Sequence, residues 1–367
     1  MIPNKIGFIG LGHIGGSIAK TIHRIYPEIR MIAYDTNTET LKMALEEGVI
    51  TKGCDGVTSD FSDCDYIYLC APVLDNSDYV NQLSGILHDD MLLTDVGSVK
   101  TGIHEQIAQF PELERHFIGG HPMCGTEHTG YEYSTAYMLE NAYYLLTPTP
   151  TVPVTKVEEF ESFVSSIGAL PMILDHQKHD FSVGSISHLP TVIASTLVNL
   201  VKNLDDETET LRTIAAGGFR DITRVASSDP TMWENICIAN KDQIISLIDT
   251  YIKAIQQTRD TVASGSPDEI KEFFSSAKEY RDSFNISRRG PIRPVYQLFC
   301  DLIDEAGGIA TIATILASNN ISIKNIGIIH NREFQQGVLQ VEFYDGDAYD
   351  QAVILLRKYH YTVYEKK

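Results

Sequence analysis

A glycine-rich segment near the start of the chain constrains the fold most. The run from Lys5 to Ile9 is short and apolar, and Gly10-Leu11-Gly12-His13-Ile14-Gly15 follows it directly. A strand that passes through such glycines into a helix is typical of the first turn of a dinucleotide-binding sheet. Gly10 allows the tight turn, Gly12 lets the backbone approach a pyrophosphate, and Gly15 lets helix and strand pack closely. The helix N-terminus would then hold the phosphates.

The next strand-like stretch, Arg30 to Asp35, ends in an acid that bears on the choice of nucleotide. Asp35 lies 20 residues beyond Gly15, where a carboxylate can accept hydrogen bonds from both ribose hydroxyls. A carboxylate there also repels a 2′-phosphate, and Thr36-Asn37-Thr38 offers no Arg to hold one. The pattern therefore favours NAD over NADP. The competing interpretation is that Asp35 only caps the following helix.

Strand-like runs alternate with helical stretches up to about residue 174. After the first two, these runs occupy residues 65–72, 91–96, 117–120, 142–146 and 170–174, and a helix is expected over 156–167. This alternation predicts an α/β domain over residues 1–177, built on a Rossmann-type, doubly wound parallel sheet.

Helical spacing of apolar residues replaces the strand rhythm beyond about residue 178. The apolar positions that recur at this spacing are Val192, Ile193, Leu197, Leu200, Val201, Leu204, Ile236, Ile244, Ile245, Leu247, Ile248, Ile252 and Ile255. An all-helical domain is therefore predicted over residues 178–287, with one helix starting at Pro230. Residues 288–294 contain two prolines and are expected to form a linker.

The tail over residues 295–367 returns to a mixed pattern. Strand-like runs are expected over 295–303, 321–329, 337–344 and 360–364, and helices after Gly307-Gly308 and over 348–358. The order β-α-β-β-α-β predicts a small α/β sandwich of the ferredoxin type.

Composition excludes several classes of function. The chain has 367 residues, enough for two or three domains, and its 29 basic and 49 acidic residues give a net charge of −20. No block of Lys and Arg stands out, which argues against nucleic acid and anionic membranes as partners. No apolar run of transmembrane length and no signal peptide is evident. The six cysteines include no C-x-x-C pair, so a reduced, cytoplasmic location is expected.

Two polar motifs follow strands of the predicted sheet. Asp95-Val96-Gly97-Ser98-Val99-Lys100 follows one strand, and His121-Pro122-Met123-Cys124-Gly125-Thr126-Glu127 follows the next. Each alone could be a loop of turn residues. Together they place Ser, Lys, His, Thr and Glu at the carboxyl ends of neighbouring strands, where doubly wound folds bind ligands. Oxidation of an alcohol needs a group that takes the hydroxyl proton, and a neutral His suits that role without a metal.

A third motif offers cations. Gly217-Gly218-Phe219-Arg220-Asp221-Ile222-Thr223-Arg224 places two Arg residues four positions apart, on one face if the segment is helical. Arg binds carboxylates through two parallel hydrogen bonds, so this segment could hold an anionic substrate. The alternative is an Arg paired within the fold to Asp221 or Glu234.

Taken together, these motifs resemble the prephenate dehydrogenase family, the cyclohexadienyl dehydrogenases of tyrosine biosynthesis. The resemblance covers about residues 4 to 287 and is carried by the glycine motif, Asp95-x-x-Ser98-x-Lys100, the His121 motif, Ser187-His188-Leu189-Pro190 and Gly218-Phe219-Arg220-Asp221-x-Thr223-Arg224. The tail resembles an ACT domain, a small amino-acid-sensing module, in its fold rhythm and in Asp304-Glu305-Ala306-Gly307-Gly308-Ile309.

The resemblance implies NAD-dependent oxidation of prephenate at its ring C4 hydroxyl with loss of the ring carboxylate, giving 4-hydroxyphenylpyruvate, CO2 and NADH. It implies that His121 accepts the hydroxyl proton, that Ser98 orients His121 near the nicotinamide, and that Arg224 pairs with a substrate carboxylate. The other residues expected at the substrate are Thr126, Glu127, His179, His188, Gly217 and Trp233. Those expected at NAD are Gly10, Gly12, His13, Ile14, Gly15, Asp35, Pro72 and Ser98, with His13 also expected to face solvent.

The resemblance further implies regulation and assembly. L-Tyrosine, the end product, is expected to bind the tail and lower activity. The candidate residues are Asp304, Gly307, Gly308, Asn319 and Asn320. A tail kept only for oligomerisation is the alternative. A homodimer formed through the helical domain is expected.

Two positions depart from the family pattern. Thr191 stands where some members carry a second His, which places a secondary proton relay in doubt, and Cys124 replaces a common Ala and is expected to pack. Other interpretations remain open at this point. They are an arogenate dehydrogenase, a β-hydroxyacid dehydrogenase without its usual catalytic Lys, and a catalytically silent amino-acid sensor.

Overall fold

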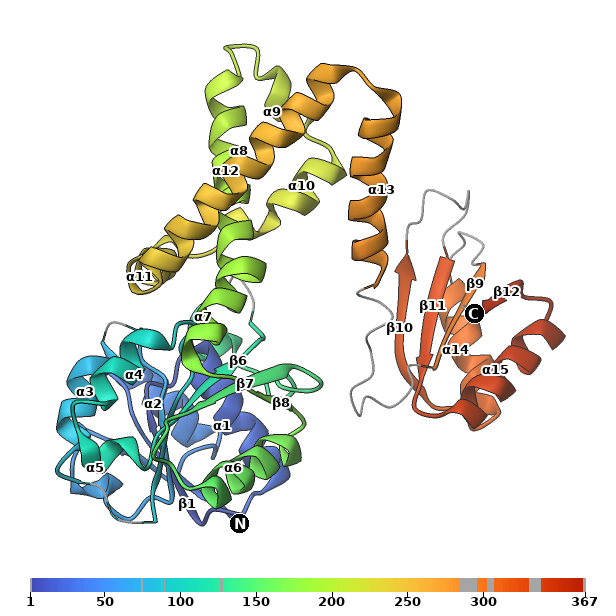
Figure 1. Cartoon of the computed structure of the whole chain (residues 1–367). Helices are drawn as coiled ribbons and strands as arrows, with labels where there is room; N and C mark the ends of the chain where they lie inside the picture. The colour runs from blue at the N-terminus through green and yellow to red at the C-terminus, as the bar shows by residue number, and fades with distance from the viewer. Residues whose placement is uncertain are drawn as a thin grey trace. The chain divides into compact units, whose positions relative to one another are not determined.

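A computed structural model describes residues 2–73, 75–86, 88, 90–125, 128–283, 296–301, 307–329 and 338–365. The chain divides by its internal packing into two units, Met1–Phe273 and Phe274–Lys367. Figure 1 shows the helices and strands of each unit.

The N-terminal unit begins with a five-stranded, fully parallel sheet in the order β3-β2-β1-β4-β5. The strand order reverses between β1 and β4, and folds of this kind bind ligands at the carboxyl ends of the strands that flank such a reversal. The strands are β1 (Lys5–Ile9), β2 (Arg30–Tyr34), β3 (Lys52–Cys54), β4 (Tyr66–Leu69) and β5 (Leu92–Asp95), and the helices are α1 (His13–Ile25), α2 (Thr38–Glu46), α3 (Asn76–Leu83), α4 (Thr101–Ile107) and α5 (Pro111–Glu114).

Helices cover both faces of this sheet, so its strands are buried on both sides (Figure 1). Alternate residues of β4 enter different cores: Tyr66 and Tyr68 pack in one apolar cluster, and Ile67 and Leu69 in the other. This explains why the sequence shows near-continuous apolar runs here. The prediction of a doubly wound parallel sheet is confirmed for these five strands, although β3, only three residues long, was not predicted.

The prediction of one parallel sheet is wrong for the next three strands. β6 (Ile118–Pro122), β7 (Tyr143–Pro148) and β8 (Leu170–Ile173) form a second sheet in which β6 and β7 are antiparallel and β7 and β8 are parallel. Among the described residues between β6 and β7, the only helix is the short η2 (Tyr131–Tyr133). Without a crossover helix the chain returns antiparallel, whereas α6 (Val154–Ser166) supplies the crossover to β8.

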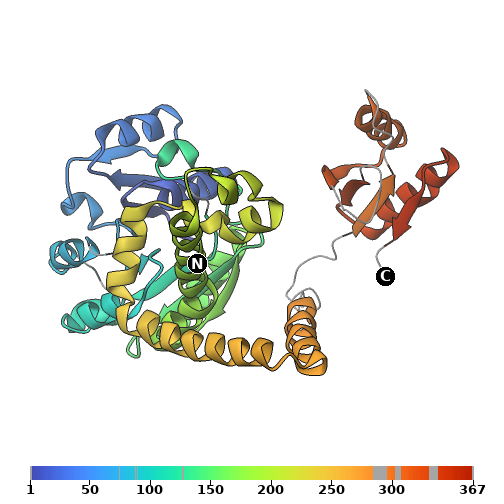
Figure 2. The same cartoon turned by 90° about the horizontal axis from the view of Figure 1, so that it is seen from above.

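The following region is all-helical over its described residues, as predicted. It comprises α7 (His176–Val183), the π-helical η3 (Gly184–His188), α8 (Leu189–Leu204), α9 (Thr210–Ile214), α10 (Gly217–Thr223), η4 (Arg224–Ser227), α11 (Pro230–Ala239), α12 (Lys241–Ser264) and α13 (Pro267–Ser283). The predicted helix start at Pro230 is confirmed: the Asp229 side chain accepts a hydrogen bond from the Met232 N–H at 2.8 Å. Figure 2 shows α12 as a single long helix. The predicted linker, 288–294, lies outside the described residues.

One helical run, His176–Leu204, is long and apolar enough to cross a membrane by length and composition, contrary to the sequence expectation. Its mean hydropathy over 18 residues is 1.3. The run carries His179, Asp180 and His188, all of them buried within the N-terminal unit. Within that 18-residue window, 28% of the run is buried.

The C-terminal unit follows the predicted β-α-β-β-α-β order. Its elements are β9 (Tyr296–Asp301), α14 (Gly308–Ser318), β10 (Ile323–Ile329), β11 (Val338–Phe343), α15 (Gly346–Lys358) and β12 (Val363–Glu365). The strands form an antiparallel sheet in the order β10-β11-β9-β12. Both helices pack on one face of this sheet, where Leu298, Leu339, Ile312 and Leu356 share one apolar core.

Candidate active site

The glycine turn has the geometry that its spacing predicts. Gly10 has a φ of +94°, and a Cβ there would lie 2.8 Å from the backbone of Cys70. A Cβ on Gly15 would lie 2.7 Å from the Gly10 carbonyl oxygen, whereas one on Gly12 would meet nothing within 4 Å. α1 starts directly after Gly12, and no side chain caps it. Its free N–H groups and the open space at Gly12 fit a pyrophosphate.

Asp35 is not the helix cap that the alternative interpretation required. Its Oδ2 accepts a hydrogen bond from the Leu11 N–H at 2.7 Å, and its Oδ1 accepts one from the Asn37 N–H at 2.8 Å. The side chain of Asn37 caps α2 instead, by accepting from the Glu39 N–H. Asp35 therefore lies against the glycine turn, where a ribose-binding acid of this fold is expected.

His13 does not face solvent, so that expectation is wrong. It is the first residue of α1 and only 8% exposed, and its Nδ1 lies 2.7 Å from the carbonyl oxygen of His128. Its Nε2 is buried and has no partner among the described residues. This unpartnered ring nitrogen beside the glycine turn fits the predicted contact between His13 and NAD. Ile14 is half-buried and Pro72 is exposed.

A buried ion pair closes the first strand-end motif, Asp95 to Lys100. Lys100 Nζ pairs with Asp95 Oδ2, and both side chains are buried. Asp95 also accepts hydrogen bonds from the Gly97 N–H at 2.9 Å and from the Gly120 N–H at 3.1 Å. Burial lowers the pKa of Lys100, although Asp95 opposes that change. Because Gly120 directly precedes His121, Asp95 fixes the position of β6 relative to the end of β5.

His121 contacts a second histidine. It lies on β6 and is 8% exposed, and its Nδ1 is 2.9 Å from Nε2 of His179 on α7. Burial, followed by the influence of His179, Lys100 and His188, holds the pKa of His121 well below its ordinary value. His121 is therefore neutral near pH 7. Ser98 is half-buried and makes no hydrogen bond among the described residues, so its predicted role of orienting His121 stays a prediction.

Asp180, which sequence reasoning missed, is next in this chain of contacts. His179 Nδ1 lies 2.8 Å from Asp180 Oδ1, and the carboxylate accepts further hydrogen bonds from the N–H groups of Lys100 at 2.7 Å and Thr101 at 2.8 Å. Burial acts to raise the pKa of Asp180, but hydrogen bonds from His179, Thr101 and Lys100 outweigh it and lower that pKa. The adjacent His179-Asp180 pair was the available sequence signal.

His188 lies beside this network. Asn240 Nδ2 donates to His188 Nδ1 at 3.1 Å and also to the Asp180 carbonyl oxygen at 3.1 Å. The rings of His188 and Trp233 meet edge to face, with centroids 5.9 Å apart. His188 Nε2 and Trp233 Nε1 are buried and unpartnered among the described residues, so both N–H groups remain to serve a ligand. Burial lowers the pKa of His188 to about 4.

The predicted substrate-binding residues Gly217 and Arg224 lie on the helical elements α10 and η4. Gly217 starts α10, which ends at Thr223, so Arg220 and Arg224 do not share one continuous α-helix as expected. Arg224 starts η4, which packs against α8, and is exposed in the single chain. Thr126 and Glu127 lie outside the described residues.

The two departures from the family pattern behave as predicted. Thr191 is buried and donates its hydroxyl hydrogen bond to the Ser187 carbonyl oxygen at 3.0 Å, so it adds no titrating group. Cys124 packs against the apolar core of the sheet domain, and burial raises the pKa of its thiol to about 11.

Comparison with known proteins supports the family resemblance seen in the sequence motifs. Residues 18–172 match the family model described as "Prephenate dehydrogenase, nucleotide-binding domain", and residues 175–276 match "Prephenate dehydrogenase, dimerization domain". The chain is 36% identical over 348 residues to the prephenate dehydrogenase of Bacillus subtilis, covering 94% of each chain. It is 32% identical over 357 residues to that of Lactococcus lactis, covering 96% of this chain and 98% of the relative.

A solved structure of similar fold is the A. aeolicus prephenate dehydrogenase in complex with hydroxyphenyl propionate and NAD+. It has a TM-score of 0.73 and 30% identity, and the match covers 77% of this chain and 99% of that one. The two curated relatives match over almost the whole length of the chain. The histidines and Asp180 around His121 lie within the two matched family models, whereas the glycine turn at residues 10–15 precedes the first of them. The chain therefore belongs to the prephenate dehydrogenase family of oxidoreductases.

Proposed function

We propose that the chain catalyses the NAD-dependent oxidative decarboxylation of prephenate to 4-hydroxyphenylpyruvate, CO2 and NADH in L-tyrosine biosynthesis. The observation that carries this proposal is the buried chain of hydrogen bonds from Asp180 through His179 to His121. It places a neutral imidazole at the carboxyl end of the sheet, beyond β5, in a fold whose glycine turn fits a dinucleotide. Family membership supports prephenate as the substrate.

NAD, when bound, accepts the hydride from the ring C4 carbon. The open backbone at Gly12 and the free N-terminus of α1 would hold its pyrophosphate, and Asp35 would accept hydrogen bonds from the ribose hydroxyls. A 2′-phosphate would place a second anion beside the Asp35 carboxylate. We therefore expect a strong preference for NAD over NADP.

His121 would accept the proton of the C4 hydroxyl as the hydride leaves. Burial keeps the His121 imidazole neutral, and the positive charge of the buried Lys100 also disfavours its protonation before the substrate reacts. Arg224 would pair with a substrate carboxylate, and Ser98 would lie at the nicotinamide end. The ring carboxylate must stay ionised to leave as CO2, so its contacts should not hold the ground state too tightly.

We also propose a homodimer formed through the helical region. The second matching family model is described as a dimerization domain, and this region exposes many large apolar side chains in the single chain. These are Phe181, Ile186, Leu200, Leu204, Ile214, Ile222, Met232, Ile238, Ile245, Ile252, Ile255 and Val262. Light scattering of the purified chain tests this: a monomer at micromolar concentration would contradict it.

Residues 295–367, within the C-terminal unit, are proposed to be an ACT domain that binds L-tyrosine and lowers activity. Gly307 has a φ of +94° and caps α14 without a side-chain hydrogen bond, which leaves free N–H groups for a carboxylate. Asn320 lines an open cavity of about 600 Å³ with Ala313, Ile321 and Tyr344, whereas Asn319 Nδ2 is bonded to the Ile315 carbonyl oxygen. Asp304 lies outside the described residues.

A cytoplasmic location is part of the proposal. The six cysteines are free thiols, which fits a reducing compartment.

NADH absorbance tests the function directly. The purified chain should produce NADH from prephenate and NAD, and much less with NADP. Asp35→Asn should lower kcat/KM for NAD and reduce the ratio of kcat/KM for NAD to that for NADP. Glu39→Gln, an equal change of charge on the exposed first turn of α2, should leave both values unchanged. Faster turnover of arogenate than of prephenate would favour the arogenate alternative. No turnover of either substrate would overturn the proposal.

A further inference from the structure

The contacts of Asp180 determine where the protons lie on two histidines. The carboxylate is buried and receives three hydrogen bonds, from the N–H groups of Lys100 and Thr101 and from the His179 ring. An ionised carboxylate can only accept hydrogen bonds. His179 must therefore carry its proton on Nδ1.

The same reasoning extends to His121. A neutral His179 that is protonated on Nδ1 presents a bare lone pair on Nε2. That Nε2 lies 2.9 Å from His121 Nδ1, so His121 must donate from Nδ1. A neutral His121 then has no proton on Nε2.

We propose that His179 and Asp180 are positioning residues that hold His121 in the tautomer protonated on Nδ1, which leaves Nε2 free to accept the substrate's hydroxyl proton. This inference rests on the proposed function for the proton that Nε2 receives. The tautomer itself is a property of the free enzyme. When His121 becomes an imidazolium, its Nδ1–H remains hydrogen-bonded to His179, which is in turn hydrogen-bonded to the Asp180 carboxylate.

Asp180 has a second task that constrains the choice of test. It accepts from the first N–H groups of α4, so replacing it would also remove a helix cap. Substitutions at His179 leave that cap in place. Asparagine can present an N–H near the Nδ1 position toward Asp180 but offers nothing at the Nε2 position. Glutamine can place its amide oxygen near the Nε2 position, where it can accept from His121.

Nitrogen NMR of the free, full-length enzyme with 15N-labelled histidine reads the tautomer without turnover. We expect His121, assigned by the signals missing from His121→Asn, to be protonated on Nδ1 in the wild type. In His179→Asn the fraction of His121 that is protonated on Nδ1 should fall, so that this is no longer the main tautomer. In His179→Gln that fraction should be restored at least in part. A wild-type His121 protonated on Nε2, or a tautomer unchanged in His179→Asn, would overturn the proposal.

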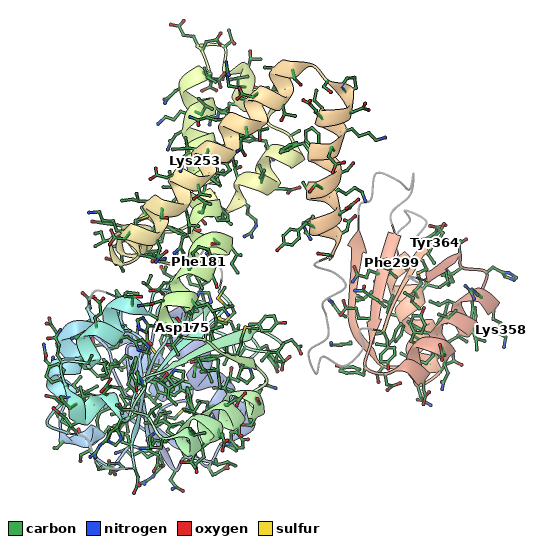
Figure 3. All side chains as sticks on the ribbon, in the orientation of Figure 1. Asp175, Phe181, Lys253, Phe299, Lys358 and Tyr364 are labelled. Carbon is green, nitrogen blue, oxygen red and sulfur yellow. The ribbon has the colours of Figure 1, made fainter. Side chains whose placement is uncertain are left out.

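Kinetics with prephenate and NAD provide the second readout. His179→Asn should lower kcat about 10–100-fold with KM for prephenate changed less than about threefold, and His179→Gln should recover part of kcat. The matched control is Asp175→Asn at the exposed N-cap of α7, whose side chain accepts a hydrogen bond from the Lys178 N–H at 2.8 Å (Figure 3). Equal kcat in His179→Asn and the wild type would contradict the proposal. If prephenate is not turned over at all, the proposed function fails, while the NMR result still decides the tautomer.

Discussion

The sheet domain with the helices beside it and the C-terminal unit differ in what they bury. The first buries Lys100, Asp95, Asp180 and several histidines around the ends of β5 and β6. Over its described residues the C-terminal unit buries no polar or charged side chain, and its core is entirely apolar. Buried charges are costly unless they are paired and hydrogen-bonded, so such a cluster is expected where chemistry requires it. The contrast fits the proposal that catalysis takes place in the first region and that the second serves regulation or assembly.

The largest expected effect tests the polar cluster. His121→Asn should lower kcat about 10²–10⁴-fold, the range for a positioned general base, because the amide cannot take up the hydroxyl proton. The matched control is His104→Gln, since His104 is also buried but hydrogen-bonds to Thr147 instead of His179. Steady-state kinetics of both variants check this. Equal losses of kcat in the two would contradict the special role of His121.

Arg224→Ala should act on binding, because it leaves a substrate carboxylate without its partner. We expect KM for prephenate to rise about 10–100-fold and KM for NAD to change little, less than for a fully buried pair because Arg224 is exposed in the single chain. Arg224→Lys should recover part of the loss, since lysine lacks the bidentate fork. An unchanged KM for prephenate would shift the assignment to Arg220.

Removal of the proposed ACT domain, residues 295–367, tests the other side of the comparison. Truncation after Arg289 should leave turnover in place and weaken tyrosine inhibition, or make it purely competitive with prephenate. Coupling between two sites is typically about 1–3 kcal/mol, so the inhibition constant should rise about 5–150-fold. Inhibition assays on both lengths check this. Identical inhibition would show that tyrosine acts at the active site, and the unit would then serve assembly.

The smallest expected effect concerns stability. Burial lowers the pKa of His104 to about 3 and of His188 to about 4, and it holds that of His121 well below 6.5. Below pH 6.5 these histidines bind protons in the unfolded chain but stay neutral in the folded chain. The free energy of unfolding should therefore decrease as the pH is lowered, by up to about 1.4 kcal/mol per pH unit for each histidine. Urea unfolding followed by Trp233, the single tryptophan, reports on this region.

The matched variant for this stability prediction is His104→Gln. Between pH 6.5 and 5 its free energy of unfolding should depend less steeply on pH, because unfolding then takes up about one proton fewer. Stability that is constant or rises as pH falls over that window would contradict the prediction.

The same two regions show what the sequence can and cannot predict. Gly10, Gly12 and Gly15 fix the first turn locally, so the strands around them were predictable, as was the order of elements in the tail. The pairing of β6 with β7 was not, because the direction of a strand depends on what crosses between the strands. The contact between His121 and His179 joins positions 58 residues apart and depends on how α7 packs against the sheet. No local pattern carries that information. Asp180 was missed because its adjacency to His179, the one local signal, does not reveal that it accepts hydrogen bonds from the start of α4.

The dependence of kcat/KM on pH, compared between the wild type and His121→Asn, tests the central claim most directly. The account predicts that the wild-type value stays level through neutral pH and falls only well below pH 6.5, where the imidazole that faces His179, Lys100 and His188 finally gains a proton. The His121→Asn enzyme should be slower throughout and should lack that acid limb. The same acid limb in both enzymes would contradict the role of His121 as the proton acceptor.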